Sequence, residues 1–278
     1  MKIKYICFEV SSICNMDCKF CFANWRENRK QLPLEKVLEI IDKLKEYGVE
    51  AINLTGGDPL LRKDITKICK HCKELDIMPI ISTTGIELLK DKEVLNYIDS
   101  INLPLDSFEQ EIHNKMRPCS IKNHHGLVLE LIEYIRKNYP NIKIKINTMV
   151  SKLNKDEVIN IGKLIEGKVY SWKLGKFFSS GYGKNFEDMF EISVEDFEKV
   201  VKNCKEKYEK INIVDQEFIP EEDEIYNIFI DCYGRVNVHT DAGIKSYENI
   251  VDLEKMGVKK NVDKVCNLKK EYLEKVYK

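Results

Sequence analysis

Eight residues near the start of the chain read Cys14-Asn-Met-Asp-Cys18-Lys-Phe-Cys21, with three cysteines separated by three and then by two residues. They follow the segment 1–10, whose apolar residues predict a first strand. Thiolates are the usual ligands of iron–sulfur clusters, and ligands packed into one loop can surround a cubane. Because a four-iron cluster normally takes four cysteines, three leave one iron open to a small molecule. The spacing therefore predicts an iron–sulfur cluster held by Cys14, Cys18 and Cys21.

Other interpretations of the cysteines remain open at this point. Structural zinc sites use four closed ligands, usually as Cys-x-x-Cys pairs separated by a longer loop. Free cysteines also pack as small hydrophobes, so the alternative is a chance cluster of buried thiols. Ten cysteines would suit a disulfide framework, but the chain is far larger than disulfide-stapled domains and shows no export signal. Cys69 and Cys72 lie within a predicted helix, where this spacing favours packing against a sheet.

Strand-like and helix-like segments alternate along the first two thirds of the chain. After the first strand, short apolar runs predict strands at 50–54, 77–82, 100–105, 142–150 and 169–174. Helical periodicity lies between them at 34–47, 62–76, 87–97, 124–138 and 154–166. Such alternation favours a parallel sheet with right-handed crossovers. The predicted fold class is therefore α/β, with six strands in an open, partial (β/α)6 TIM-like barrel.

The pattern changes after Gly181. A polar loop leads into a predicted helix at 193–209, and short strands follow at 211–215, 225–231 and 234–239. The turn Tyr233-Gly234 joins the last two and predicts a hairpin. We therefore expect a barrel core at 1–182 and a carboxy-terminal extension at 183–278 that packs on it.

The charge of the chain is high but balanced, with 45 basic and 46 acidic residues and a formal net charge of −1. This balance argues against a partner such as nucleic acid, although it is compatible with a local basic pocket for phosphates. No apolar stretch approaches the roughly 20 residues that span a bilayer. The start is too short and too interrupted for a signal peptide. We therefore expect a cytoplasmic protein without a membrane partner, and a monomer as the default.

A second motif, Leu54-Thr55-Gly56-Gly57-Asp58-Pro59, follows the second predicted strand. On its own, Gly-Gly-Asp is only a turn. Together with Cys-x3-Cys-x-aromatic-Cys, in which Phe20 takes the aromatic position, it resembles the two signatures of the radical S-adenosylmethionine (SAM) superfamily. The family turn is usually Gly-Gly-Glu, so Asp58 is shorter by one methylene. By this resemblance, Gly56 and Gly57 let the backbone approach the methionine part of SAM, and the carboxylate of Asp58 receives its ammonium group.

The resemblance implies a [4Fe-4S] cluster whose open iron binds SAM through the amine and carboxylate of its methionine part. An electron from a reductant such as flavodoxin or ferredoxin then breaks SAM into methionine and a 5′-deoxyadenosyl radical, which abstracts hydrogen from the substrate. Further SAM contacts are expected from Phe20 and from Ser82, Thr84 and Ser107, which follow strands at the ligand-binding face of such barrels. The alternative is that the three hydroxyl residues merely cap loops.

Beyond these motifs, most of the chain resembles the viperin family of antiviral nucleotide dehydratases. The family converts CTP, in some cases UTP or GTP, to a 3′-deoxy-3′,4′-didehydro nucleotide by removal of the 4′ hydrogen and loss of water from C3′. Tyr233 matches a tyrosine implicated in quenching the substrate radical; otherwise it is a hairpin-turn residue. The resemblance also implies substrate contacts at Asn53, Thr55, Lys145, Asn147 and Lys173. It rests on Asp106-Ser107-Phe108, Lys122-Asn123-His124, Lys143-Ile144-Lys145-Ile146-Asn147, Trp172-Lys173 and Ile230-Asp231-x-Tyr233, among other segments.

Lysines recur where an apolar strand is expected. Lys143, Lys145 and Asn147 alternate on one face of a predicted strand, and Lys173 lies on the next. A buried lysine is costly unless it meets an anion, and a triphosphate is a suitable one. The alternative is an edge strand with solvated lysines.

Two positions depart from the viperin pattern. Ala51 and Ser171 stand where the family has phosphate-binding cations. Each missing charge-assisted contact is worth about 1.5–3 kcal/mol. Compensating cations are available at Arg26, Arg29, Lys30 or Lys176, and the alternative is that the substrate is not a nucleoside triphosphate.

The sequence thus supports a radical SAM nucleotide dehydratase, with two alternatives. One is a radical SAM enzyme that acts on a peptide natural product or a sugar nucleotide. The other is an electron carrier or regulator with a cluster but no catalysis. The Gly-Gly-Asp turn and the barrel disfavour the latter.

Overall fold

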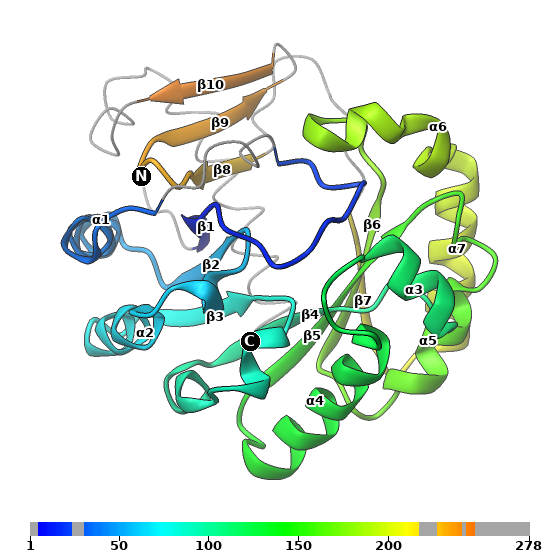
Figure 1. Cartoon of the computed structure of the whole chain (residues 1–278), viewed down its shortest axis with the longest axis horizontal. Coiled ribbons are helices and arrows are strands. Elements are labelled where there is room, and N and C mark those ends of the chain that lie inside the picture. The colour runs from blue at the N-terminus through cyan, green and yellow to red at the C-terminus, as the bar shows by residue number, and fades with distance from the viewer. Residues whose placement is uncertain (1–4, 24–30, 217–226, 241–242, 248–278) are drawn as a thin grey trace.

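The computed structural model describes residues 5–23, 31–216, 227–240 and 243–247 (Figure 1). Ten strands form one sheet in the order β10-β9-β8-β1-β2-β3-β4-β5-β6-β7. They are β1 (Tyr5–Ser11), β2 (Ala51–Gly56), β3 (Met78–Ser82), β4 (Ser100–Pro104), β5 (Lys143–Val150), β6 (Ser171–Lys176), β7 (Asn212–Gln216), β8 (Asn227–Ile230), β9 (Val236–Thr240) and β10 (Gly243–Tyr247).

The sheet confirms the predicted α/β partial barrel. Strands β1 to β7 are parallel neighbours, and β8 joins β1 in parallel. The segment 211–215, expected in the extension, instead adds β7 as a seventh parallel strand beside β6. Strands β8 and β9 pair antiparallel as the predicted hairpin, and β10 continues this pairing. Strands on both sides of residue 182 therefore belong to one sheet; the division into core and extension stays a prediction.

Helices cover the outside of the curved sheet (Figure 1). Five predicted helices are present within a few residues of their expected bounds: α1 (Leu34–Glu46), α2 (Ile65–Glu74), α4 (His124–Asn138), α5 (Val158–Ile165) and α7 (Val194–Lys207). The structure adds the short helices η2 (Pro59–Leu61), α3 (Gln110–Met116), η5 (Gly181–Phe186) and α6 (Glu187–Phe190).

The prediction of a single helix at 87–97 is wrong. Two 3-10 helices occupy the segment, η3 (Ile86–Leu89) and η4 (Glu93–Tyr97). The side chain of Asp91 accepts a hydrogen bond from the backbone N–H of Glu93 at 2.8 Å. Such a local turn competes with helical hydrogen bonding, so it divides a segment whose apolar pattern alone suits one helix.

The two faces of the parallel strands pack in separate clusters. On β1, Ile6, Phe8 and Val10 are completely buried and pack in the core shared with the helices. The intervening residue Cys7 points to the other, inner face, because successive strand residues alternate. On that face, Tyr5, Ala51 and Ile80 of β1–β3 pack with Val214 of β7. This contact between β1–β3 and β7, which lies at the far edge of the sheet, shows that the sheet curls around its inner face.

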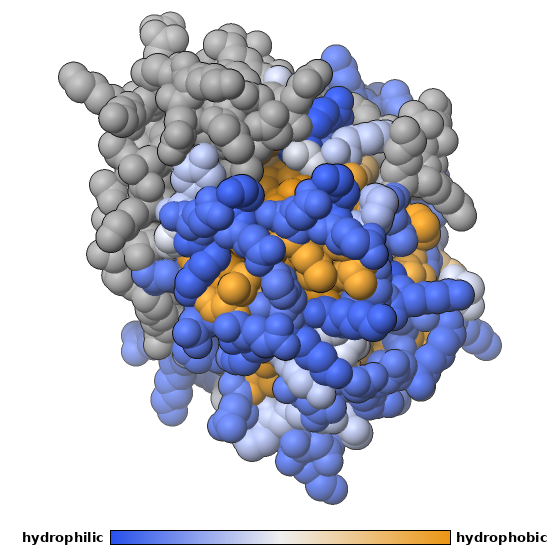
Figure 2. Space-filling model, turned by 90° about the vertical axis from the view of Figure 1, so that its left-hand side faces the viewer, coloured by the Kyte–Doolittle hydropathy of each residue, from blue (hydrophilic) through white to orange (hydrophobic). Residues whose placement is uncertain are grey.

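On the side that carries α1 and α2, the surface is mainly hydrophilic, with apolar patches between hydrophilic side chains (Figure 2). On α1, the exposed pairs Lys36–Glu39 and Lys43–Glu46 lie 2.6 and 2.9 Å apart. In the described ranges, no helix is long and apolar enough to cross a membrane.

Candidate active site

The three motif cysteines lie in the loop 12–23, here named the cysteine loop, which follows β1. Backbone hydrogen bonds fix it to three other segments. Asp58 N donates to Ile13 O at 2.7 Å, Asp17 N to Pro118 O at 2.8 Å, and Gly183 N to Cys21 O at 2.8 Å. The loop is therefore held in place along its whole length.

The motif thiols influence one another's pKa values. Burial raises the pKa of Cys18 to about 12 and also raises that of Cys14, and Cys21 adds to both shifts. Among the described residues, no three His, Cys, Asp or Glu side chains gather tightly enough for a single metal ion. Three thiols in one loop suit an iron–sulfur cluster, and a coordinating metal would deprotonate Cys14 and Cys18 despite their raised pKa.

The two glycines of the second motif lie directly against the cysteine loop. Gly56 has φ +124°, a conformation that favours glycine, and a Cβ there would lie 2.0 Å from Ser11 O. A Cβ on Gly57 would lie 2.1 Å from Ile13 O. Close backbone approach between this turn and the loop therefore requires glycine at both positions.

Gly57→Ala should displace the cysteine loop and lower its capacity to hold a cluster and SAM. We expect at least a tenfold loss of SAM affinity in reconstituted protein, measured by equilibrium binding. Gly175→Ala is the control, because the nearest atom to its added Cβ lies 3.9 Å away. Equal losses in both variants would contradict this role of Gly57.

Asp58 is completely buried, and its carboxylate has four protein donors. Oδ1 accepts from Leu60 N at 2.9 Å and from the Thr83 hydroxyl at 2.8 Å. Oδ2 accepts from the Thr84 backbone N at 3.0 Å and from its hydroxyl at 2.5 Å. Burial raises the pKa of Asp58, and these hydrogen bonds oppose the shift.

Among the other residues predicted to contact SAM, Phe20 and Thr84 lie at the cysteine loop, whereas Ser107 makes its hydrogen bonds elsewhere. Thr84 contacts Asn15 of the cysteine loop at 3.0 Å, and the ring of Phe20 packs edge-on against Phe190 at 5.6 Å. The buried hydroxyl of Ser107 instead donates to Glu157 and accepts from Glu109 N. The structure thus brings Thr84 to the cysteine loop, to which Phe20 itself belongs, and gives Ser107 the hydrogen bonds of a loop cap.

Arg117 is a site residue that the sequence pattern does not reveal. Its Nη1 lies 3.9 Å from Cys18 Sγ, and its Cζ lies 5.0 Å from the centroid of the Phe20 ring. Asp106 holds the guanidinium through Nε at 2.5 Å. A cation beside a motif thiol favours the thiolate, and it lowers the pKa of Cys18 against the effect of burial.

A pair of buried histidines links Asp106 to Thr84. Asp106 N donates to Nδ1 of His113 at 3.1 Å, so Nε2 of His113 carries the proton and faces Nδ1 of His124 at 2.8 Å. His124 Nε2 then donates to Thr84 O at 2.7 Å. Burial lowers the pKa of His113 to about 2 and that of His124 to about 4. Both rings are therefore neutral near pH 7, each in a single tautomer.

The histidine pair should make stability fall in mild acid. The pKa of histidine in an unfolded chain is about 6.5. Below that pH the unfolded chain binds protons at these histidines and the folded chain does not, so the folded state loses stability. His113 alone should lower the free energy of unfolding by about 2 kcal/mol between pH 7 and pH 5. His113→Phe should be less stable at pH 7 but should lose this pH dependence. Urea titrations at pH 7 and pH 5 measure both effects. If the free energy of unfolding of His113→Phe depends on pH as strongly as that of the wild type, the assignment is wrong.

Polar residues from neighbouring strands continue along the inner face. Ser82 donates to Asn53 Oδ1 at 2.8 Å, and Asn102 Nδ2 donates to Ser82 at 2.8 Å. Asn53 Nδ2 donates to Cys7 Sγ at 3.6 Å. Ser82, predicted to contact SAM, therefore belongs to the same network as Asn53, predicted to contact substrate.

Two lysines lie on the neighbouring strands β5 and β6, where Lys145 pairs with Ser171 and Lys173 pairs with Asn147. Lys145 is only 3% exposed and lies on a strand paired on both sides, which removes the edge-strand alternative. Burial lowers the pKa of Lys145 and of half-buried Lys173, and the charge of Lys173 lowers that of Lys145 further. Beside them, Asn147 Oδ1 and Ser171 Oγ are buried without a hydrogen-bond partner. This part of the inner face thus combines two lysine amino groups with polar atoms that have no hydrogen-bond partner.

The remaining predicted residues lie in other parts of the structure. Tyr233 lies in the turn between β8 and β9, with Arg235 Cζ 4.7 Å from its ring centroid. Thr55 and Lys176 are half-buried at the ends of β2 and β6. Arg26, Arg29 and Lys30 lie outside the described residues.

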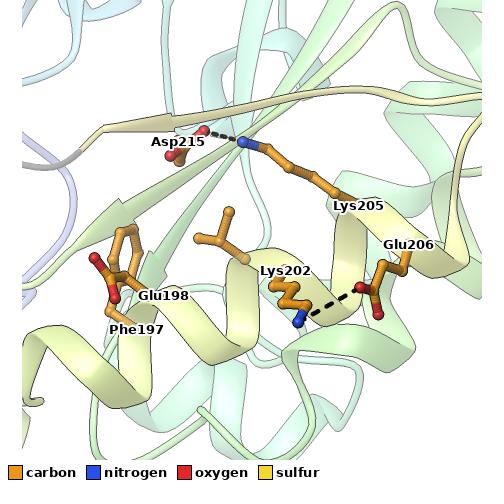
Figure 3. Close-up of a pocket in the computed structure, with 7 residues that line it drawn as sticks. Phe197, Glu198, Lys202, Lys205, Glu206 and Asp215 are labelled. Atoms are coloured by element: carbon orange, nitrogen blue, oxygen red, sulfur yellow. Dashed lines mark hydrogen bonds and ion pairs between the residues drawn. The ribbon is translucent and has the colours of Figure 1, made fainter.

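Cys69 and Cys72 are completely buried on α2 in the apolar core, as their helical spacing predicts. A separate pocket lies between α7 and β7, lined by Phe197, Val201, Lys205 and Asp215 among others (Figure 3). None of the predicted site residues lines it.

Comparison with known proteins identifies the family. Residues 8–165, more than half of the chain, match the model of the radical SAM superfamily. An S-adenosylmethionine-dependent nucleotide dehydratase from Flammeovirga pacifica is 31% identical over 218 residues, which cover 72% of each chain. A protein of the same name from Lacinutrix mariniflava is 30% identical over 213 residues, which cover 70% of this chain and only 43% of that relative. A GTP 3′,8-cyclase from Helicobacter pylori is 31% identical over 193 residues, covering 66% of this chain and 59% of the relative.

Solved structures share the fold at lower identity. SuiB from Streptococcus suis, bound to S-adenosylmethionine, superposes with a TM-score of 0.69 at 19% identity, over 85% of this chain and 60% of SuiB. The protein anSMEcpe with bound AdoMet gives a TM-score of 0.65 at 15% identity, over 84% of this chain and 73% of that one. With the family match, the cysteine loop and the Gly-Gly-Asp turn, these comparisons establish that the chain is an enzyme of the radical SAM superfamily.

Proposed function

We propose that this enzyme dehydrates a nucleoside triphosphate to its 3′-deoxy-3′,4′-didehydro form, a chain terminator with an antiviral role. The observation that carries the proposal is that buried Lys145 and half-buried Lys173 lie beside two unpartnered atoms, Asn147 Oδ1 and Ser171 Oγ. Two lysines and the hydroxyl of Ser171 suit the oxygens of a polyanion such as a triphosphate, and a bound anion favours the charged form of both lysines. The names of the nucleotide dehydratase relatives support the same substrate class.

In this proposal Cys14, Cys18 and Cys21 hold a [4Fe-4S] cluster, and SAM binds beside the turn at Gly56 and Gly57. When bound, cluster and SAM supply the radical that removes hydrogen from the substrate. Phe20, Asp58, Ser82, Thr84 and Ser107 contribute to the SAM site by contact or by support. The protein contributes position and exclusion of water; the cysteine loop is held at three points and most of these residues are buried.

The inner face would orient the substrate. Lys145 and Lys173 bind phosphate oxygens, and Asn147, Asn53 and Thr55 bind neighbouring polar groups. Ser171, in place of a family cation, offers a hydroxyl donor. The completely buried Ala51 packs in the apolar floor of the inner face and offers no polar group. Fewer cations than in the viperin pattern would then hold the triphosphate.

The reaction balances with two electrons per turnover. One electron would be used to generate the radical from bound SAM. Removal of the 4′ hydrogen and of the 3′ hydroxyl, which leaves with a proton as water, gives a species one electron short of the product. We infer that Tyr233 relays the second electron to it. A flavodoxin- or ferredoxin-type reductant in the cytoplasm would supply both electrons to the monomeric enzyme.

The deciding experiment incubates reconstituted, reduced enzyme anaerobically with SAM and each nucleoside triphosphate, followed by mass spectrometry. The proposal expects 5′-deoxyadenosine and the loss of one water from one nucleotide. Formation of a bond between C3′ and C8, as the name of the GTP 3′,8-cyclase relatives indicates for them, would leave the mass of GTP unchanged. Formation of 5′-deoxyadenosine with every nucleotide unchanged in both mass and chromatographic retention would contradict a nucleotide substrate and favour a peptide or sugar nucleotide.

A further inference from the structure

The carboxylate of Asp58 has no capacity left for a ligand. Its two oxygens accept the four hydrogen bonds from Leu60, Thr83 and Thr84 described above, and a carboxylate offers about four lone-pair sites. The side chain is also 0% exposed. In the Gly-Gly-Glu turn that this motif resembles, one more methylene would carry the carboxylate further from the backbone. The shorter Asp58 is instead held among protein donors.

Thr84 connects Asp58 to the cysteine loop. Its hydroxyl lies 2.5 Å from Asp58 Oδ2 and 3.0 Å from Asn15 Oδ1, but its single hydrogen can be donated to only one of these acceptors. The Nδ2 of Asn15 is at the same time buried without a partner. Rotation of the Asn15 amide by 180° resolves both conflicts, because Nδ2 then donates to Thr84 Oγ1, which donates to Asp58.

The resulting chain of hydrogen bonds runs from Asp58 through Thr84 to Asn15, the residue between Cys14 and Met16. The backbone carbonyl of Thr84 is fixed from the other side by His124 at 2.7 Å. Every group in this chain is buried or half-buried, so water competes little with it. Displacement of Asp58 would therefore be transmitted to the cysteine loop.

We propose that Asp58 is a positioning residue that fixes the cysteine loop through Thr84 and Asn15, and does not itself receive the ammonium group of SAM. The inference rests on the proposed SAM site and changes the role of one residue in it. The proposed role of Asp58 can be tested in ligand-free protein, so the test does not depend on which substrate the enzyme uses.

The first test measures amide hydrogen exchange of residues 12–21 in the ligand-free full chain. Asp58→Asn and Thr84→Val should each speed exchange in this loop at least tenfold, and the double variant should be no faster than either single one. Thr84→Ser, which keeps the hydroxyl, should behave like the wild type. Unchanged exchange in Asp58→Asn, or additive effects in the double variant, would overturn the proposal.

The second test compares two ligands on reconstituted protein: S-adenosylhomocysteine and its counterpart in which hydrogen replaces the amino group. A positioning role predicts that Asp58→Asn weakens both by the same factor, about three- to tenfold, and that Asp58→Glu also weakens them because the pocket has no room. Direct contact predicts instead that only the aminated ligand loses affinity and that Asp58→Glu retains it. Wild-type protein that binds neither ligand would overturn the SAM site on which this inference rests, whereas a failure to dehydrate nucleotides would leave it intact.

Discussion

Cys18→Ala should abolish SAM cleavage, with 5′-deoxyadenosine formation reduced more than a hundredfold. Cys18 is the most deeply buried of the three motif thiols and the one that Arg117 contacts. Loss of one of three protein ligands leaves two thiolates, too few to hold a four-iron cluster. Reconstituted variant protein should therefore contain far less iron and sulfide than wild type, measured per chain. The two assays together separate loss of the cluster from loss of catalysis.

Cys69→Ala is the matched control for this prediction. Cys69 is also a completely buried thiol, but it lies on α2 in the apolar core. Removal of its sulfur should cost stability, about 1 kcal/mol, and leave iron content and SAM cleavage close to wild type. If Cys69→Ala loses its iron while Cys18→Ala keeps it, the assignment of the cluster ligands is wrong.

The sequence predicts those parts of the molecule that depend on local pattern. Alternating apolar runs reveal the strands β1–β6, and the bounds of α4 at His124 and Asn138 are predicted to the residue. The cysteine loop and the Gly-Gly-Asp turn are recognisable because short spacings carry their chemistry. The helix predicted at 87–97 fails because one side-chain turn at Asp91 outweighs its apolar periodicity.

The missed features depend on contacts between distant segments. Arg117 reaches Cys18 across almost a hundred residues, from the end of the seven-residue α3, which is too short to give a periodic signal. His113 and His124 become a fixed pair only when α3 and α4 pack together. The saturated carboxylate of Asp58 is likewise invisible in the motif, because its donors Thr83 and Thr84 come from the end of another strand.

Lys145→Met should weaken binding of inorganic tripolyphosphate and of nucleoside triphosphates about ten- to hundredfold. A charge-assisted hydrogen bond is worth about 1.5–3 kcal/mol, and this range corresponds to that loss. Tripolyphosphate carries no base or sugar, so it tests the cationic part of the inner face alone. Titration calorimetry on ligand-free protein measures the change without need for a cluster, SAM or turnover.

Lys143→Met is the control on the same strand. Lys143 shares the strand face of Lys145, but it is half-buried and its Nζ lies 4.5 Å from the ring of Tyr170. Its replacement should change tripolyphosphate affinity less than threefold. Equal losses in the two variants would indicate a general effect of positive charge and would contradict a specific phosphate site at Lys145.

The pH dependence of Lys145 gives a second readout with a defined sign. Burial lowers the pKa of Lys145 in the folded chain. Below the usual lysine pKa, the unfolded chain therefore binds more protons than the folded chain, which lowers the free energy of unfolding. This loss of stability is already present at pH 7. Ligand-free Lys145→Met should therefore be more stable than the wild type at pH 7, although it binds phosphate less well. An anion beside Lys145 favours its protonated form, so binding should take up protons and affinity should fall as pH rises. Calorimetry in buffers of different ionisation enthalpy would measure this uptake, and its absence in Lys145→Met would locate it at this residue.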